Sequence, residues 1–393
     1  MTTIELPVSI GEALDKLSIL EIKLEKIQDQ RRLDVQKEYD AIYTNLAYLF
    51  TEDAKFHYRC LKEVNLKIWE DQDIFRESLD AKQREELCMK IIEENDRRFH
   101  IKKKLNRLFD SALQEQKGYE QKTAFFFGHL GLGDMIGCMG LIRYLSTKYD
   151  LVRVVCFRRN YNTFQSMVSD DPVIQPYVID SLNELRINDL ESSLERFKSI
   201  VGNAHVYCAG EEVFGKEPEI YYIPFCFYDD CKIPREMFWS YFHIAFSPEA
   251  KELAHRVEGI EYAFIHSQSS NGPLFHVEVA ESLMEKSKDD VLIIDCNKNV
   301  YEEGHKWYDL AQQFVNRPMS FYTNTLSGAS YICVSDSSLF CMAIHMDIPN
   351  AKQCWYLSRS DENYSYYFND EVVKYTKNFC SRQFYKVGLG YTY

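Results

Sequence analysis

Apolar residues change their spacing near residue 120 and divide the chain into a helical part and a longer remainder. Before that point they recur every three or four positions, which is the period of an amphipathic helix. The first stripe consists of Ile10, Leu14, Leu17, Leu20, Leu24 and Ile27, and the second of Val35, Tyr39, Ile42, Leu46 and Leu49. Alternating steps of four and three resemble a short coiled-coil seam. We therefore predict a helical, coiled-coil-like domain over residues 1–118.

Local signals place the helices of this domain. The segment from Ser9 to Glu12 has the pattern of a capping box at a helix start. Two further helices are predicted over residues 54–78 and 81–116. The last carries a basic run of Arg97, Arg98, Lys102, Lys103, Lys104 and Arg107. We interpret this run as a solvated helix face, with a site for an anionic surface or acceptor as the alternative.

From residue 123 onward, short apolar runs alternate with helical segments. The first series predicts strands over 124–127, 152–157, 177–179 and 205–208, with helices over 135–148, 161–168 and 190–199. A helix start at Ser247-Pro248 opens a second series, with strands over 262–266, 291–295, 331–334 and 354–357. Repeated β-α spacing is typical of a parallel sheet covered by helices. The predicted fold class is α/β, with Rossmann-like lobes over residues 119–246 and 247–393 and a ligand between their carboxyl edges.

A glycine-rich turn joins the first predicted strand to its helix. Gly128, Gly131 and Gly133 allow a sharp turn and a close approach to the backbone, and Asp134 stands at the helix start. Such a turn suits an anion or a developing negative charge. Asp134 is common there as a helix cap, and in a functional interpretation it is a general base for an acceptor hydroxyl.

Two polar loops follow strands of the second series. Ser335, Asp336, Ser337 and Ser338 lie between a strand and a helix, where free amides suit a diphosphate; ordinary capping is the alternative. His266, Ser267 and Gln268 form a polar loop that could add phosphate or sugar contacts.

A dinucleotide site is the competing interpretation of the first turn. Gly131, Gly133 and Gly137 have a G-x-G-x-x-x-G spacing, and Arg158 and Arg159 follow the next strand, where the 2′-phosphate of NADP would bind. An aspartate inside the turn is awkward beside a pyrophosphate, and no Tyr-x-x-x-Lys pair follows. The single Asp-x-Asp pair, at Asp71 and Asp73, lies in the charged helical domain, so we expect no obligatory metal and no cofactor.

Composition narrows the class of protein. A length of 393 residues favours two or three domains. The formal charge of −14 argues against general nucleic-acid binding. Twelve cysteines without close paired spacing are typical of reduced thiols rather than zinc ligands. No apolar window is long enough to span a membrane, and the N-terminus has no secretory pattern, so we expect a cytoplasmic protein.

Residues 127–145 and 331–349 together resemble the bacterial heptosyltransferase-like glycosyltransferases. In the first segment the resemblance lies in the Gly-Asp turn after a strand, and in the second it lies in a strand, an Asp-Ser pair and a small-residue helix ending near Pro349. This chain departs from the family at Ser338, where the family has glycine, and at Cys341, where it has histidine. His345 lies one helical turn later. The helical domain is not part of the basic family fold.

The resemblance implies a two-lobed GT-B-type glycosyltransferase that inverts the sugar without a metal. It implies Asp134 as the base, and Asp336, Ser337 and Ser338 as ligands of a nucleotide-diphosphate sugar whose sugar passes to a glycan or glycoconjugate hydroxyl. Two alternatives remain: a non-catalytic nucleotide- or glycan-binding scaffold, and an NADP-dependent oxidoreductase. Self-association through residues 1–118 is a further expectation.

Overall fold

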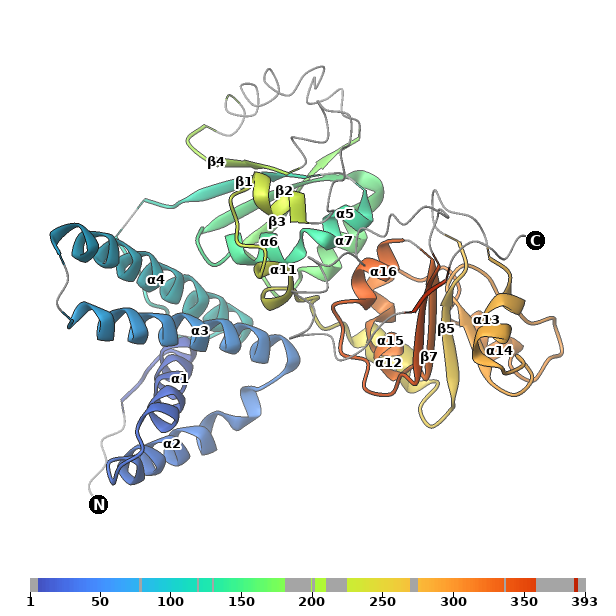
Figure 1. Ribbon diagram of the computed structural model, residues 1–393, viewed down its shortest axis with the longest axis horizontal. Helices are drawn as coiled ribbons and strands as arrows, with labels where there is room; N and C mark the ends of the chain where they lie inside the picture. The colour runs from blue at the N-terminus through green and yellow to red at the C-terminus, as the bar shows by residue number, and fades with distance from the viewer. Residues whose placement is uncertain are drawn as a thin grey trace.

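The computed structural model describes residues 6–77, 80–118, 120–128, 131–180, 199, 202–209, 225–268, 275–335, 337–357 and 385–387. It confirms the predicted class, because an N-terminal helical domain is followed by two α/β lobes with parallel sheets (Figure 1). One hydrophobic cluster continues through all three parts, with Leu61 in the helical domain, Leu141 in the first lobe and Val334 in the second.

Long helices build the N-terminal domain: α1 (Ile10–Lys26), α2 (Arg32–Leu46), α3 (Glu52–Phe75) and α4 (Ala81–Leu108), with a short turn η1 (Ala47–Leu49). The Ser9 hydroxyl caps α1 by accepting from the amide of Glu12, as the sequence predicts. Gly11 lets α1 approach α4, because a Cβ there would lie 2.5 Å from the carbonyl oxygen of Lys102.

Helix α4 ends at Leu108, earlier than the predicted residue 116. Asp110 takes the left-handed conformation with φ 48°, and the amide of Ser111 donates to the carbonyl of Asn106. The Asn106 side chain in turn accepts from the amide of Gly11. The helix therefore ends where its last turn is tied to the start of α1.

The first lobe contains a four-stranded parallel sheet in the order β3-β2-β1-β4. Its strands are β1 (Thr123–Phe127), β2 (Leu151–Phe157), β3 (Ile174–Ile179) and β4 (His205–Cys208). The described helical segments are α5 (Leu132–Gly137), α6 (Met139–Leu145), η2 (Arg158–Asn160), α7 (Tyr161–Met167), α10 (Phe225–Asp230) and α11 (Met237–Ser240).

The second lobe contains a five-stranded parallel sheet in the order β6-β5-β7-β8-β9. Its strands are β5 (Tyr262–His266), β6 (Leu292–Asp295), β7 (Tyr331–Ser335), β8 (Gln353–Leu357) and β9 (Tyr385–Val387). The described helical segments are α12 (Pro248–His255), α13 (Val277–Met284), α14 (Tyr308–Gln312), η4 (Met319–Tyr322), α15 (Thr323–Gly328) and α16 (Ser338–Ala343). The sequence pattern did not predict β9.

The predicted helix over residues 135–148 is divided into α5 and α6 at Cys138. Gly140 in α6 packs directly against α11, since a Cβ there would lie 2.2 Å from the carbonyl oxygen of Met237. The predicted helix over 190–199 lies outside the described residues, apart from residue 199.

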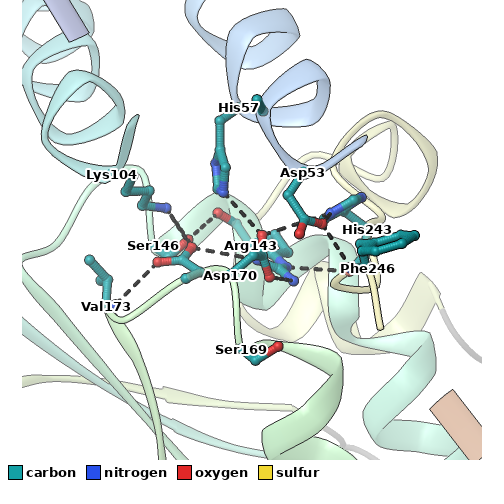
Figure 2. Close-up of polar contacts among 12 residues, drawn as sticks. Asp53, His57, Lys104, Arg143, Ser146, Ser169, Asp170, Val173, His243 and Phe246 are labelled. Atoms are coloured by element: carbon teal, nitrogen blue, oxygen red, sulfur yellow. Dashed lines mark hydrogen bonds and ion pairs between the residues drawn. The ribbon is translucent and has the colours of Figure 1, made fainter. Parts of the chain in front are cut away.

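The basic run of α4 is a correction to the sequence analysis. Most of it does not form a solvated face, because Lys103 and Lys104 pair with aspartates of the first lobe, as Figure 2 shows for Lys104. Arg98 and Lys102 pair instead with acidic residues of α1. Lys104 Nζ lies 2.7 Å from Asp171 Oδ2, and both side chains are buried. Arg97 is also buried, and it pairs with Glu94 at 2.6 Å. Sequence periodicity could not show these acceptors, because most of them come from distant segments.

Among the helices of the described residues, none combines the length and apolar character needed to cross a bilayer.

Candidate functional site

The two predicted glycine and serine motifs meet where α5 of the first lobe packs on α16 of the second (Figure 1). A Cβ placed on Gly133 would lie 3.4 Å from the Cα atom of Ser338 and 3.6 Å from Cys341 Sγ. These distances are ordinary van der Waals contacts, so the starts of the two helices touch. Residues separated by two hundred positions therefore form one junction at the carboxyl edges of both sheets, the usual ligand site of open parallel sheets.

Asp134 lies in the first turn of α5, three positions after Gly131. Its Oδ2 atom would lie 2.7 Å from a Cβ at position 131, so the carboxylate folds back over the start of its own helix. A negative charge at this place stabilises the helix dipole. The capping role predicted from the sequence fits this geometry, and the base role requires an acceptor hydroxyl at the same carboxylate.

A histidine and a serine connect the ends of two neighbouring strands at the edge of the second sheet. His266 is the last residue of β5, and its Nδ1 atom lies 2.7 Å from the Ser337 hydroxyl at the start of α16. Burial lowers the pKa of His266 to about 4. The imidazole is therefore neutral at pH 7, and it can either donate to or accept from the serine hydroxyl.

The hydroxyl of Ser335, the last residue of β7, is buried and has no hydrogen-bond partner among the described residues. Ser335 as a whole is only 3% exposed. An unsatisfied buried hydroxyl costs free energy, so a partner at this edge would stabilise it.

Ser267 and Gln268 are held by two residues that the sequence analysis missed. The Ser267 hydroxyl donates to Asp295 Oδ2 at 2.5 Å, and the amide of Gln268 donates to Asn297 Oδ1 at 2.9 Å. Asp295 is the last residue of β6, and burial raises its pKa. A lone aspartate at a strand end gave only a weak signal, since its partner lies 28 positions away. The buried Ser267 hydroxyl is thus already hydrogen-bonded within the protein, whereas Gln268 is exposed to solvent.

Cys341 lies within α16, with its Sγ atom toward Gly133 at the junction, and His345 follows the end of the helix. The His345 ring stacks on Phe242 with 3.9 Å between ring centroids, and its Nδ1 atom donates to the Cys341 carbonyl at 2.6 Å. Burial lowers the pKa of His345 to about 3. His345 is therefore a packed neutral ring that joins α16 to the segment between the lobes. Asp336 lies outside the described residues.

One cluster in the described part of the chain has the composition and spacing of a metal site. Ligand atoms of Asp53, Asp170 and His243 lie within 4.8 Å of one another. Asp170 already accepts from Arg143 at 2.6 and 2.9 Å and from His57 at 3.0 Å (Figure 2). The Arg143 charge repels a cation, and the carboxylate oxygens are occupied, so these residues do not fit a metal ion.

The arginines proposed for an NADP phosphate have other contacts. Arg158 pairs with Asp180 through two hydrogen bonds, and the guanidinium of Arg159 lies over the Phe157 ring at 4.6 Å. A groove of about 1230 Å³ lies at the other end of the second sheet and is lined by residues such as Tyr262 and Ser330. Its charged residues largely pair with each other, as Lys352 does with Glu261.

Comparison with known proteins gives a family match for the N-terminal part only. Residues 4–125 match DUF6165, a family of unknown function, and this match covers less than half of the 393 residues. No curated protein sequence matches the chain.

Three solved glycosyltransferase structures are similar to this chain. They are ADP-heptose LPS heptosyltransferase II of E. coli, a family 9 glycosyl transferase of Veillonella parvula, and the iron-containing dodecameric TibC of enterotoxigenic E. coli. The first is 13% identical with a TM-score of 0.39, over 60% of this chain and 84% of that one. The second is 11% identical with a TM-score of 0.39, over 71% of this chain and 90% of that one. TibC is 16% identical with a TM-score of 0.34, over 63% of this chain and 61% of that one.

Proposed function

We propose that this protein is a glycosyltransferase that takes a nucleotide-diphosphate sugar at the junction of α5 and α16. The main support is the contact of Gly133 with Ser338, which brings the turn of Asp134 to the serine-rich edge of the second sheet. A base on one lobe and diphosphate ligands on the other are what transfer to a hydroxyl requires. The motif resemblance found in the sequence favours the same activity.

In this mechanism the acceptor oxygen displaces the diphosphate directly at the anomeric carbon, so the new glycosidic bond forms as the bond to the diphosphate breaks. Asp134 takes the proton of the acceptor hydroxyl as it attacks, and the leaving diphosphate gains hydrogen bonds from Ser335, Ser337 and neighbouring amides. No metal or other cofactor is needed if these donors stabilise the charge. Because the lobes touch at Gly133, they have to part for the donor to enter, and closing again excludes water.

A panel of UDP, GDP, ADP and CMP, each with and without magnesium, tests the binding step. A ligand that binds the folded state raises the melting temperature by mass action. We expect a shift with one diphosphate that does not depend on magnesium. No shift with any of them would contradict the proposed donor site.

Two substitutions localise that binding. Ser335→Ala removes a buried hydroxyl without a described partner, so it should not lower the melting temperature of the free protein, and it should weaken diphosphate binding. Thr325→Val is the matched control, because Thr325 is also fully buried with an unpartnered hydroxyl but lies in α15, away from the junction. Equal effects of both variants on binding would rule out Ser335 as a ligand.

Asp134→Asn separates catalysis from binding. We expect it to retain the diphosphate and lose at least about 100-fold in transfer rate, the usual contribution of a general base. Full transfer activity would remove the base role of Asp134.

A non-catalytic scaffold that binds a nucleotide or a glycan is a second candidate function. It is favoured because the Ser267 and Ser337 hydroxyls already have protein partners, and because Cys341 stands where the heptosyltransferase-like family has histidine. Diphosphate binding without any turnover by the wild-type protein would favour it.

A further inference from the structure

The segment that joins the two lobes is held by side chains of the helical domain along most of its length. This segment, residues 240–247, is called the interlobe linker below. Arg59 of α3 donates to the carbonyl of Ser240 at 2.7 Å, and Arg97 of α4 donates to the Tyr241 hydroxyl at 2.5 Å. The helical domain thus reaches the start of the linker from two helices.

Asp53, near the start of α3, holds the second half of the linker. Its Oδ1 atom lies 2.7 Å from His243 Nε2 and accepts from the amide of Phe246 at 2.9 Å (Figure 2). A charged acceptor makes these stronger than hydrogen bonds between neutral groups. One carboxylate therefore fixes two points of the linker, three residues apart.

The first lobe holds the same linker at fewer points. The guanidinium of Arg143 donates to the His243 carbonyl at 3.3 Å, and the amide of Ala245 donates to the Met167 carbonyl at 2.9 Å. On another side the linker borders a cavity of about 280 Å³, lined also by Glu52, Thr323 and Asp347. Tyr241, Ala245 and Ser247 of the linker are buried, whereas Phe246 is exposed, so packing and polar contacts together set the path of the linker.

The linker is in turn coupled to the proposed donor site. Phe242 stacks on His345, which follows α16 and donates to the carbonyl of Cys341 within it. The start of that same helix contacts Gly133 of the first lobe. A displacement of the linker therefore moves the element that closes the junction between the lobes.

We propose that the helical domain anchors the interlobe linker and thereby sets how the second lobe meets the first at α5 and α16. Asp53 is the main positioning residue, and Arg59 and Arg97 assist it. The helical domain then controls the closure of a two-lobed protein from outside the site, whatever ligand that site takes. Domain closures of this kind use a few residues at element ends as hinges.

Hydrogen–deuterium exchange of the full chain tests this proposal. Asp53→Ala removes both linker contacts of the carboxylate, and we expect exchange to accelerate about tenfold or more in residues 240–247 and 338–346. Strands β1 and β5 should keep their protection. Asp53→Asn retains an oxygen that can accept from Phe246, so its exchange should lie close to that of the wild-type protein.

Glu52→Ala is the matched control, because Glu52 carries the same charge in the same helical turn and, among the described residues, its side chain pairs with the exposed Lys55 rather than with the linker. Faster exchange at the linker without any change at α16 would overturn the coupling, as would equal effects of Glu52→Ala and Asp53→Ala. If Asp53→Ala does not fold, Arg59→Ala removes the Ser240 contact from an exposed side chain and carries the same two expectations. Neither result depends on the proposed transferase activity, since no ligand is present in the experiment.

Discussion

Replacing Asp170 with alanine should strongly destabilise the junction between the helical domain and the first lobe. The carboxylate is fully buried and accepts two hydrogen bonds from Arg143 and one from His57 (Figure 2). Burial alone would raise the pKa of Asp170, but Arg143 and the imidazole of His57 outweigh it and hold the pKa well below its usual value. The substitution removes both hydrogen bonds from Arg143 to Asp170 and leaves Arg143 with the Asp171 carboxylate at 3.8 Å.

Removing one partner of a buried ion pair costs about 3–5 kcal/mol. For a folding unit of 150–250 residues, each kcal/mol lowers the melting temperature by about 2–4 °C, so we expect the first calorimetric transition to fall by about 6–20 °C. Asp180→Ala is the control, because its pair with Arg158 is exposed to solvent and should contribute little to stability.

A double variant tests the coupling of the pair. The variant that combines Arg143→Met with Asp170→Leu replaces both charges by apolar side chains. It should lose less unfolding free energy than the sum of the losses of the two single variants. The reasoning would be refuted if Asp170→Ala melted at the same temperature as the Asp180→Ala control. It would also be refuted if the double variant lost as much unfolding free energy as the two single variants together.

Further predictions concern a close helix contact, pH and the junction glycine. Gly140→Ala places a Cβ 2.2 Å from the Met237 carbonyl oxygen, so the unfolding free energy should fall by about 1–3 kcal/mol; a denaturation midpoint equal to wild type would contradict this contact. Gly133→Ala meets only ordinary contact distances and should melt like wild type. His100, His266 and His345 have pKa values lowered to about 4, 4 and 3, with burial as the largest cause. Between those values and about 6.5, the folded state binds fewer protons than the unfolded state. The contribution of these histidines to the free energy of unfolding is therefore fully present above pH 6.5, and on acidification it falls by up to about 1.4 kcal/mol per histidine and pH unit. Urea midpoints that do not change between pH 7.5 and 5 would argue against three buried neutral histidines.

The fold was largely predictable because buried parallel strands are continuous apolar runs. Residues 124–127 and 262–266 have this pattern and form β1 and β5. Glycine and proline signals likewise marked the turn before α5 and the start of α12. Strand β9 was missed, because three residues in a tyrosine-rich segment show no period. The division into α5 and α6 was missed because the apolar positions continue through Cys138.

The site was predictable only in part, for a physical reason. A polar loop after a strand can be recognised from neighbouring residues, which gave Asp134, His266 and Ser337. The partners of such residues lie far away in sequence, as Asp295 does from Ser267. The same reason explains the error at α4, where Lys104 pairs with Asp171 across a domain boundary. Local periodicity identifies an amphipathic helix, but it does not identify what covers the polar face.

The most direct test of the donor site maps where a nucleoside diphosphate binds. Hydrogen–deuterium exchange of the wild-type protein would be compared with and without the diphosphate that shifts its melting temperature most. We predict simultaneous protection of residues 132–137 in the first lobe and of residues 266–268 and 335–343 in the second, because the ligand lies between α5 and α16. Protection confined to one lobe, or found instead at the groove lined by Tyr262 and Ser330, would contradict the account.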